Sequence, residues 1–505
     1  MKSLLKSKFF IPLIIFATSV FIKLLILYKA PIYSDEITWM VRGKEFLYSF
    51  IHLNFNYFKT AWWTDVSQTE AISIPLSIIN GSFHLLFAGV GKFSLKIMPD
   101  IIASRLAVAL VTSLIPVFIY IFANKFCGIW VGILASTLYI FNPVTISMDS
   151  LVMNDSLLSL FSFLSVFTFV SAIKENKNSF WPGIFLGLAF LTKPNGILIG
   201  VVWIFTLVFL RSKSILKLIL LNLGSFFLTT FILWPSSWSA PGVSVFEYIL
   251  RQYSLVKTGV PYFYLGEISN NPNWTFYFFQ FFTRFTEVTL FGVLLSSIFF
   301  IKQFIYKKKI KLPKYFGIFA SFFITFAILI TISNQKLGIR YAAPLIPYFC
   351  IASSWGILKF LEIIPKNIQK FYLIFVVILI SVPVFKFFPN YYLYYNNFIG
   401  GVVGAQRYDM VGLCSSSKEA FEFLSFKGSA GSVFIAGCPA ATNYYSSLEV
   451  TNDFMNADYV VVETYHRKQY PTHPLYKFLE NKSPIYEVEI QKATIAQVYE
   501  FVKSK

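Results

Sequence analysis

Apolar runs that are long enough to cross a membrane recur along the chain, and they limit the fold more than any other feature. A membrane-spanning helix needs about 20 mostly apolar residues. About eleven runs approach that length, if a few short or broken ones are included. They lie near 9–28, 101–122, 128–146, 156–173, 180–192, 195–210, 215–235, 286–301, 315–332, 343–360 and 371–388. The sequence therefore predicts a polytopic α-helical membrane protein with about 11 transmembrane helices.

The composition agrees with a membrane protein and argues against a nucleic-acid partner. Hydrophobic residues make up 56% of the chain, charged residues only 13%, and the mean hydropathy is +0.64. The net charge of +19 invites a nucleic-acid interpretation. Most of the basic residues, however, lie in short clusters between apolar runs, which is the orientation signal of membrane helices. We therefore expect membrane lipids, and no nucleic acid, among the partners.

The basic clusters predict which side of the membrane each loop faces. Clusters that fall on one side of the predicted helices are Lys2, Lys6, Lys8, Lys125, Lys174, Lys177, Arg211, Lys213, Lys217, the group from Lys302 to Lys314, Lys366 and Lys370. The positive-inside rule places them in the cytoplasm. We expect the first run to be a retained signal-anchor helix, with the N-terminus cytoplasmic. We expect a multi-pass protein of the cell membrane. An odd number of crossings then places the C-terminal residues on the outer side of that membrane.

The sequence divides into two predicted domains. Residues 1–389 form the transmembrane domain, with large outer loops at 29–100 and 236–285. Residues 390–505 form a small extracytoplasmic α/β domain. Its strand-like runs are 432–436, 458–462, 485–490 and 495–502, and 418–424 and 474–479 are helical in pattern. Cys414 and Cys438 fall in this domain, where a disulfide is permitted, but their spacing leaves open whether they pair.

Two acidic sites are candidates for catalysis. Asp35 and Glu36 follow the first apolar run, and a carboxylate at the rim of a membrane domain is costly unless it is solvated or used. Asp35 is a candidate general base, or an anchor for an attacking hydroxyl, with Glu36 fixing the local turn. Asp155 begins a later helix and could face Asp35 across one cavity. The alternative for all three is capping of a helix N-terminus, and for Asp155 capping is favoured.

Basic residues on the predicted outer face run against the orientation bias. They are Arg105, Lys193, Lys336 and Arg340. A cavity that holds both acids and cations suits a reaction whose leaving group is a phosphate. Snorkelling to lipid headgroups or salt bridging explains each residue equally well, and Lys23 and Lys29 are assigned to snorkelling.

The remaining polar and aromatic motifs are less specific. No histidine has metal-ligand spacing from another His or a Cys, except for a loose pair at His466 and His473, so we predict no zinc or haem site. A clear Asp-x-Asp motif is also missing, so we predict no metal ligand and no obligatory metal. Whether a divalent metal is used stays open. The aromatics at Trp62, Trp63, Trp234, Trp238 and Trp274 either stack on a sugar or, more commonly in membrane proteins, line the interface.

Several short motifs occur in a fixed order along nearly the whole chain. They are 33–36 (YSDE), 104–106 (SRL), 154–158 (NDSLL), 183–193 (GIFLGLAFLTK), 336 and 340–347 (RYAAPLIP) and 395–401 (YNNFIGG). In order and sidedness, they resemble the GT-C glycosyltransferases, of the protein O-mannosyltransferase and aminoarabinose-transferase-like branch. The chain departs from many relatives in the first large loop, where Ser73-Ile74-Pro75 stands in place of a His- or Lys-Pro-Pro element.

The resemblance implies a GT-C-like transmembrane domain and an inverting transferase that uses a polyprenyl-phosphate sugar as donor. Asp35 would deprotonate an acceptor hydroxyl on a protein, lipid or cell-envelope glycan, and Asp155 would shape the site. Arg105, Lys193 and Arg340, with Lys336 as a further candidate, would bind the lipid phosphate. Tyr341 would add a hydrogen bond there.

Two other functions remain open. A transporter or lipid flippase would carry no covalent chemistry, but transporters usually place polar residues near the bilayer midplane, whereas here the acids gather at one face. A structural assembly protein would use the external domain to bind a partner, and it would leave the acidic and basic residues unexplained. The sequence therefore favours an enzyme.

Overall fold

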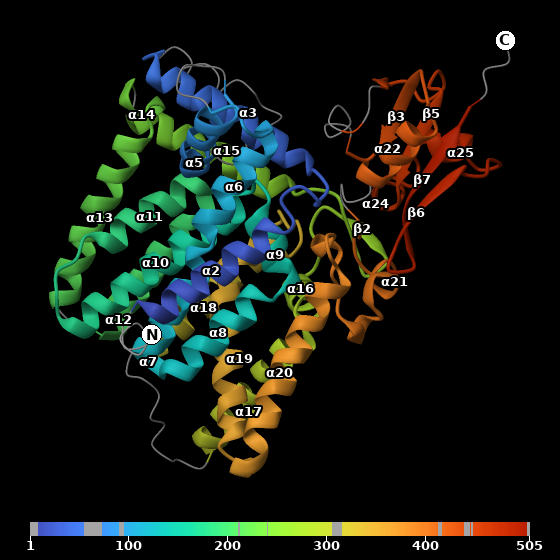
Figure 1. Ribbon diagram of the computed structural model, residues 1–505. Helices are drawn as coiled ribbons and strands as arrows, with labels where there is room; N and C mark the ends of the chain where they lie inside the picture. The colour runs from blue at the N-terminus through green and yellow to red at the C-terminus, as the bar shows by residue number, and fades with distance from the viewer. Residues whose placement is uncertain are drawn as a thin grey trace.

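The computed structural model describes residues 9–54, 73–89, 95–210, 213–239, 241–305, 316–412, 417–438, 445 and 448–501. Over these ranges the chain forms a bundle of helices, and a small sheet domain stands beside one end of the bundle (Figure 1). Lys2, Lys6, Lys8, Trp62, Trp63, Arg211 and Cys414, which the sequence singles out, lie outside the described residues.

The helices of the first half of the bundle are α2 (Phe10–Leu24), α3 (Ser34–Ile51), α5 (Ile74–Phe87), α6 (Asp100–Thr112), α7 (Leu114–Cys127), α8 (Ile129–Ile140), α9 (Pro143–Ser150), α10 (Asn154–Glu175), α11 (Trp181–Thr192), η1 (Pro194–Ile197), α12 (Leu198–Leu210) and α13 (Lys213–Leu233). The second half comprises α14 (Ser236–Ser239), α15 (Pro241–Thr258), α16 (Phe276–Arg284), α17 (Glu287–Ile305), α18 (Phe316–Ile332), η2 (Ile339–Leu345), α19 (Ile346–Leu361) and α20 (Lys366–Lys386).

Over the described residues, five helices are long and apolar enough to cross a membrane, and up to seven spans result if each of two bent helix pairs counts as one. Shorter apolar helices add to these at 10–24, 74–87, 181–192, 194–205 and 322–332. Each apolar run named above coincides with one of these helices. The prediction of a polytopic helical membrane protein is confirmed, whereas the number of crossings and their direction stay predictions.

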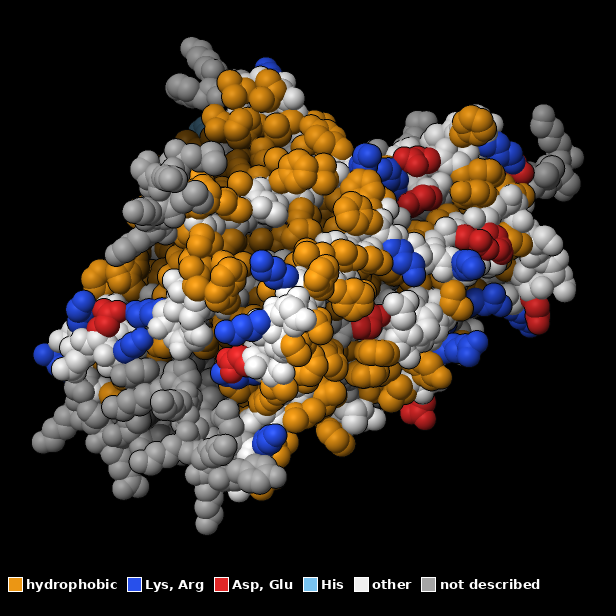
Figure 2. Space-filling view, turned by 60° about the horizontal axis from the view of Figure 1, so that its bottom comes forward, with side chains coloured by type: hydrophobic (Ala, Val, Ile, Leu, Met, Phe, Trp, Pro, Cys, Tyr) orange, Lys and Arg blue, Asp and Glu red, His pale blue; other side chains and the backbone are white. Residues whose placement is uncertain are grey.

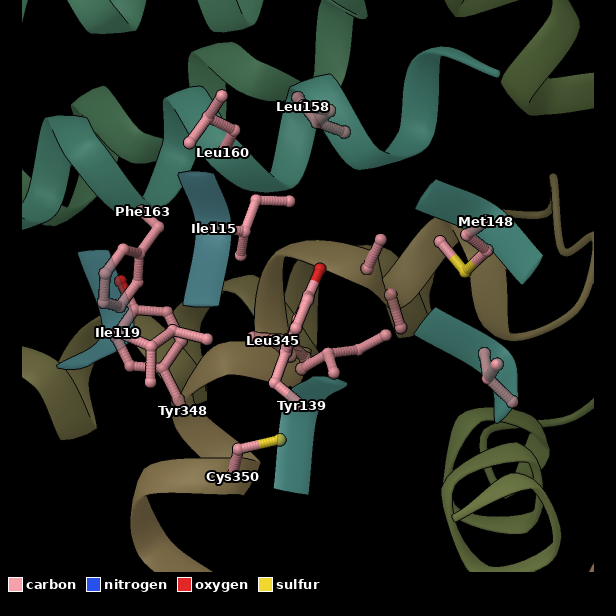
Figure 3. Close-up of a cluster of buried hydrophobic side chains, with 14 of the residues drawn as sticks. Ile115, Ile119, Tyr139, Met148, Leu158, Leu160, Phe163, Leu345, Tyr348 and Cys350 are labelled. Atoms are coloured by element: carbon pink, nitrogen blue, oxygen red, sulfur yellow. The ribbon is translucent and has the colours of Figure 1, made fainter. Parts of the chain in front are cut away.

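The bundle has an apolar core and an apolar surface. Figure 3 shows Ile119 of α7 and Phe163 of α10 beside Tyr348 of α19, within a larger apolar cluster. Figure 2 shows apolar side chains over much of one face of the bundle, with more charged side chains toward the C-terminal domain. Outward apolar side chains such as Phe385, which is 82% exposed, suit a lipid environment.

Small residues let α17 and α19 pack in close contact. A Cβ added to Gly356 would lie 2.2 Å from the Gly292 carbonyl oxygen, and one added to Gly292 would lie 2.1 Å from Ser353 Oγ. The Ser296 hydroxyl donates a hydrogen bond to the Ala352 carbonyl across the same contact. Small residues at this interface replace the hydrophobic driving force, which is weak between helices in lipid.

The assignment of Lys23 to snorkelling is wrong. The Lys23 side chain is 4% exposed, and its Nζ lies 3.0 Å from an Asp149 carboxylate oxygen and 3.0 Å from Thr112 Oγ1. Tyr139 Oη lies 3.4 Å from the other oxygen of Asp149. Charges within a membrane domain are costly unless they are paired, and this pair joins α2, α6 and α9.

Helices occupy both of the long segments predicted as outer loops. The first segment contains α3 and α5, which pack closely because Gly43 faces Gly81 and Asn80 Nδ2 donates to the Trp39 carbonyl (2.8 Å). The second contains α14, α15 and α16, and a two-stranded antiparallel hairpin of β1 (Tyr262–Tyr264) and β2 (Glu267–Ser269). Figure 1 shows α3, α5 and α15 at the end of the bundle where the C-terminal domain stands.

The C-terminal domain is built on a five-stranded sheet with the order β4-β3-β5-β7-β6. Its strands are β3 (Ser432–Ala436), β4 (Glu449–Val450), β5 (Tyr459–Glu463), β6 (Tyr486–Ile490) and β7 (Ala493–Glu500), and its helices are α22 (Ser417–Phe426), α24 (Thr464–Gln469) and α25 (Pro474–Phe478). β3 is parallel to β4 and β5, whereas β7 is antiparallel to β5 and β6. The predicted small α/β domain is therefore present, and Cys438 forms a disulfide, whereas Cys127 and Cys350 are free.

The segment before this sheet packs into the helical core and contains η3 (Tyr391–Leu393), η4 (Asn397–Ile399) and α21 (Gly401–Ala405). Fully buried Asp409 holds the segment in place. One carboxylate oxygen accepts hydrogen bonds from Tyr262 Oη (2.8 Å) and the Met410 N–H (2.9 Å). The other accepts from Gln280 Nε2 and Tyr395 Oη, both at 2.7 Å. Burial raises the pKa of the Asp409 carboxyl, and hydrogen bonds from Tyr395 and Tyr262 oppose that shift.

We expect Asp409→Ala to lower the free energy of unfolding by about 2–5 kcal/mol, because it leaves buried hydroxyl and amide donors without an acceptor. The thermal unfolding midpoint of the detergent-solubilised protein measures this loss. Glu422→Ala is the control, since the Glu422 side chain is 62% exposed and its contact with Lys418 is 3.9 Å long. An equal, small effect of both substitutions would contradict the role given to Asp409.

Candidate active site

Asp35 lies in the first turn of α3 and pairs with Arg340 of η2. Arg340 Nη1 donates to Asp35 Oδ2 at 2.7 Å. The side chain of Asp35 is 42% exposed, whereas that of Arg340 is 12% exposed. The two residues are 305 positions apart in sequence, so the fold brings together two candidates that the sequence names separately.

A glycine sets the direction in which η2 begins. Gly338 has φ +73° and ψ −170°, in a region that favours glycine. The helix that follows is held against α10 by a hydrogen bond from Ser159 Oγ to the Ala343 carbonyl (3.1 Å). Arg340 and Tyr341 occupy its first turn, so this turn delivers both side chains to the same place.

Asp155 and Lys193 form the second ion pair of the site. Lys193 Nζ donates to Asp155 Oδ1 at 2.6 Å, and the side chains are 7% and 2% exposed. Lys193 Nζ also lies 4.0 Å from the centroid of the Tyr341 ring. The capping interpretation of Asp155 is wrong, because Met153 is the N-cap of α10 and no side chain caps that end.

The two pairs belong to one charged group. Tyr341 lies between them, since the Arg340 guanidinium is 5.8 Å from the ring that Lys193 covers. The Asp155 carboxylate also acts electrostatically on Arg340. Each anion has one cation, so the group carries no net charge. Its exposed end is Asp35, and its buried end is the Asp155–Lys193 pair.

Glu36 and Arg105 form a separate, fully buried pair beneath the loop that precedes α3. Arg105 Nε and Nη2 donate to the two carboxylate oxygens of Glu36 at 2.8 and 2.7 Å. The remaining Arg105 donors reach the carbonyls of Leu27 (2.7 Å), Ala30 (3.1 Å) and Pro31 (2.8 Å).

Glu36 is satisfied on both oxygens. Its carboxylate also accepts from the N–H groups of Tyr33 (2.9 Å) and Val152 (3.0 Å). The N–H donors of the Arg105 guanidinium are used within the protein. The structure therefore gives these two residues a role in holding the loop, and neither one presents a free group to a substrate.

Lys336 contacts a different part of the chain from the other candidates. Its Nζ donates to Asn271 Oδ1 (2.9 Å) and to the Pro272 carbonyl. Burial lowers the pKa of the Lys336 ammonium. The lysine joins the loop before η2 to the loop after β2, whereas Lys193 and Arg340 contact the two aspartates.

The C-terminal domain reaches the same region. Cys438 follows β3 and Tyr465 follows β5, and both pack with Tyr33 and Met153 beside the acidic residues. Tyr445 Oη accepts a hydrogen bond from the Ile32 N–H at 2.6 Å. The carboxyl ends of two parallel strands therefore face the loop that precedes α3 and Asp35.

The structure adds tyrosines that sequence reasoning missed. The Tyr33 ring lies 4.8 Å from that of Tyr392, and Tyr277 of α16 acts electrostatically on Asp155. Tyr33 belongs to the sequence motif at 33–36, so the motif could have identified it as a site residue. Tyr277 lies in a run rich in phenylalanine, which carries no such signal. Among the described residues, no three His, Cys, Asp or Glu side chains gather closely enough to hold a metal ion.

Comparisons with known proteins give one family-model match and several similar folds. Residues 86–238 match the family model described as dolichyl-phosphate-mannose-protein mannosyltransferase. ArnT from Cupriavidus metallidurans bound to undecaprenyl phosphate has a similar structure, with a TM-score of 0.52, 13% identity, and coverage of 97% of this chain and 98% of that chain. The archaeal oligosaccharyltransferase AglB from Archaeoglobus fulgidus gives a TM-score of 0.46 and 10% identity. That alignment covers 90% of this chain and 69% of the AglB chain. No curated protein sequence matches the chain.

The fold is thus that of ArnT over nearly the whole chain, despite low sequence identity. The predicted resemblance to GT-C glycosyltransferases, in the mannosyltransferase-like branch, is confirmed by the family model and by this fold.

We expect Arg105→Lys to lower the free energy of unfolding by about 2–3 kcal/mol, because a lysine cannot supply the planar, five-donor geometry that Glu36 and the carbonyls use. The thermal unfolding midpoint without substrate measures the effect. Arg407→Lys, at an exposed position, is the matched control. A normal midpoint combined with weak binding of polyprenyl phosphate would instead make Arg105 a phosphate ligand.

Proposed function

We propose that this protein is an integral-membrane inverting glycosyltransferase that moves a monosaccharide from a polyprenyl-phosphate donor to a hydroxyl acceptor on the extracytoplasmic face. The observation that carries the proposal is the charged group of Asp35, Arg340, Tyr341, Lys193 and Asp155 within a GT-C fold. The acceptor is a hydroxyl of a protein, a lipid or a cell-envelope glycan.

Asp35 is the proposed general base. It is the most exposed carboxylate of the group, and its second oxygen, Oδ1, is not used in the ion pair with Arg340. As the acceptor oxygen bonds to the anomeric carbon, its proton passes to Asp35 and the bond from that carbon to the phosphate oxygen breaks. Attack opposite to the leaving group inverts the anomeric configuration.

Lys193 and Arg340 are the proposed phosphate ligands. Both are already held near the site by carboxylates, so a bound phosphate can take over hydrogen bonds at little cost in side-chain ordering. A phosphate that draws Arg340 toward itself also releases Asp35 from its ion pair. Donor binding and exposure of the base are coupled in this way.

Asp155 and Tyr341 have supporting roles in the proposal. Asp155 orients Lys193 (2.6 Å), and the Tyr341 ring stabilises the Lys193 ammonium through a cation–π contact. The proposal includes no obligatory cofactor, because Lys193 and Arg340 can offset the charge of the leaving phosphate, and the use of a divalent metal stays open. Lys336 stays a candidate that acts through the loop it fixes.

The membrane supplies the donor, and the cytoplasm supplies none of the reacting groups. We propose that the N-terminus is cytoplasmic in a cell membrane and that the domain of residues 390–505 is extracytoplasmic. The proposed boundary at 390 lies just before the segment that packs on the bundle, so the two domains share a firm interface through Asp409.

We expect Asp35→Asn to lower the rate of sugar transfer by roughly 10²–10⁴-fold, because an amide cannot accept the acceptor proton. Affinity for the polyprenyl-phosphate donor should change only a few-fold, since the amide keeps the shape of the side chain. The measurement is transfer to an acceptor by the purified protein in lipid nanodiscs, together with donor binding.

Asp100→Asn is the matched control for that substitution. The side chain of Asp100 is also 42% exposed and also contacts a side-chain nitrogen, His84 Nε2, at 3.1 Å, but it lies outside the charged group. Its transfer rate should stay near that of the wild type. Equal rates for the Asp35 variant and the wild type would remove Asp35 as the base, and movement of lipid without transfer would favour a flippase.

A further inference from the structure

The helix α16 lies at a steep angle to the helix that follows it. The directions of 276–284 and 287–302 differ by 120° across a short break. α17 runs from this bend toward the Lys302 to Lys314 cluster, which the positive-inside rule places in the cytoplasm. With α17 across the bilayer, α16 lies at the outer end of that span and is inclined toward the membrane plane.

One face of α16 carries exposed aromatic side chains. Trp274 in the turn before the helix and Phe278 and Phe282 within it follow at intervals of four residues, which places them on one side. They are 67%, 68% and 52% exposed, whereas Tyr277 and Phe281 on the other side are 4% and 8% exposed. An amphipathic helix with an aromatic outer face is typical of a helix that lies in a membrane interface.

Phe398 of η4 extends this face. It is 62% exposed, and its ring stacks on that of Phe282 with 5.8 Å between the centroids. The neighbouring Asn396 fixes the contact, because its N–H donates to the Thr283 carbonyl (2.9 Å) and its Nδ2 donates to the Phe285 carbonyl (3.0 Å). The aromatic ridge of α16 and η4 consists of Trp274, Phe278, Phe282 and Phe398.

The aromatic ridge continues the apolar surface of α17. Phe291, Leu294 and Ile298 of α17 are 47%, 56% and 49% exposed, and α17 forms one of the bent candidate spans with α16. Exposed apolar side chains on a span meet acyl chains. A surface that changes from largely aliphatic along the span to aromatic at its outer end follows the change from acyl chains to headgroups. Lipid is therefore the partner that this surface fits.

The buried face of α16 connects the aromatic ridge to the site. α16 packs against η2, which carries Arg340. Phe281 stacks on Phe349 of α19, the helix into which η2 leads, with 4.3 Å between the ring centroids. Gln280 Nε2 donates to the buried carboxylate of Asp409 (2.7 Å). These contacts tie the depth of η2 in the membrane to the depth of the ridge.

We propose that the aromatic ridge lies in the headgroup region of the outer leaflet and sets the depth of the site in the membrane. The consequence for the donor rests on the proposed function. A lipid-anchored phosphate is confined to the level of the headgroups, so Arg340 reaches it only when η2 is held at that level. A donor that is soluble in water is under no such restriction.

The location is tested by cross-linking the full-length protein in lipid nanodiscs. Phe278→p-benzoylphenylalanine introduces a photoreactive ring, and we expect irradiation to attach a phospholipid, detected as added mass of the intact protein. The same amino acid in place of Phe385 on α20, which is 82% exposed, is the positive control. In place of Phe426 it should give no lipid adduct, because Phe426 is 94% exposed but belongs to α22 of the C-terminal domain.

The role in depth is tested by combining Phe278→Ser, Phe282→Ser and Phe398→Ser. We expect the KM for a long-chain polyprenyl-phosphate sugar in nanodiscs to rise roughly 3- to 10-fold with kcat unchanged, because access to the donor is weakened and the chemistry is not. The KM for a short-chain, water-soluble analogue should stay the same. Phe426→Ser is the control and should change neither value.

Each part of the proposal can fail separately. An adduct at position 385 without one at position 278, or equal adducts at positions 278 and 426, overturns the location. Cross-linking of position 278 to a second copy of the chain in place of lipid makes the ridge a protein interface and overturns it as well. Equal rises in KM for the long-chain and short-chain donors overturn the role in depth. A wild type that transfers no sugar removes the proposed function and the consequence for the donor, whereas a lipid adduct at position 278, which needs no turnover, still supports the location.

Discussion

The site depends on the buried contact between Arg105 and Glu36. Arg105 in α6 donates hydrogen bonds to three carbonyls of the loop after α2 and to both carboxylate oxygens of Glu36 in the first turn of α3. Glu36 also accepts a hydrogen bond from the Val152 N–H, which fixes the α9–α10 connection. Because this connection leads directly into α10, one ion pair fixes the places of Asp35 and Asp155 together.

A similar arrangement holds the opposite wall. Asp409 hydrogen-bonds to the β1–β2 hairpin, to α16 and to Tyr395 of the segment before the C-terminal sheet. Arg284, within this assembly, holds the Tyr392 carbonyl, and the Tyr392 ring packs against Tyr33. Buried, hydrogen-bonded polar groups thus lie on both sides of a charged group that has fewer internal hydrogen bonds.

Much of this fold follows from sequence patterns, but only part of the site does. Apolar runs and alternating strands predict the helices and the C-terminal sheet, because burial in lipid or in a sheet imposes a period on the chain. The motifs also place Asp35, Asp155, Lys193, Arg340 and Tyr341 near one another. The sequence does not show that adjacent Asp35 and Glu36 have different roles. The difference arises because the helix turn directs one carboxylate outward and the other toward Arg105. Lys23 shows the same difficulty, because its partner Asp149 lies 126 positions away (149 − 23). Tyr277 lacks any local signal, because its burial depends on α16 packing against η2.

The absence of net charge in the resting site has a consequence for selectivity. Inorganic phosphate and other small anions in the surrounding medium meet no surplus cation, and to bind they would have to displace carboxylates from two established ion pairs. A phosphate attached to a long prenyl chain is already concentrated in the bilayer by the hydrophobic effect, at about 0.8 kcal/mol for each buried methylene. In the proposed mechanism, membrane partitioning therefore favours a lipid-linked phosphate over soluble anions.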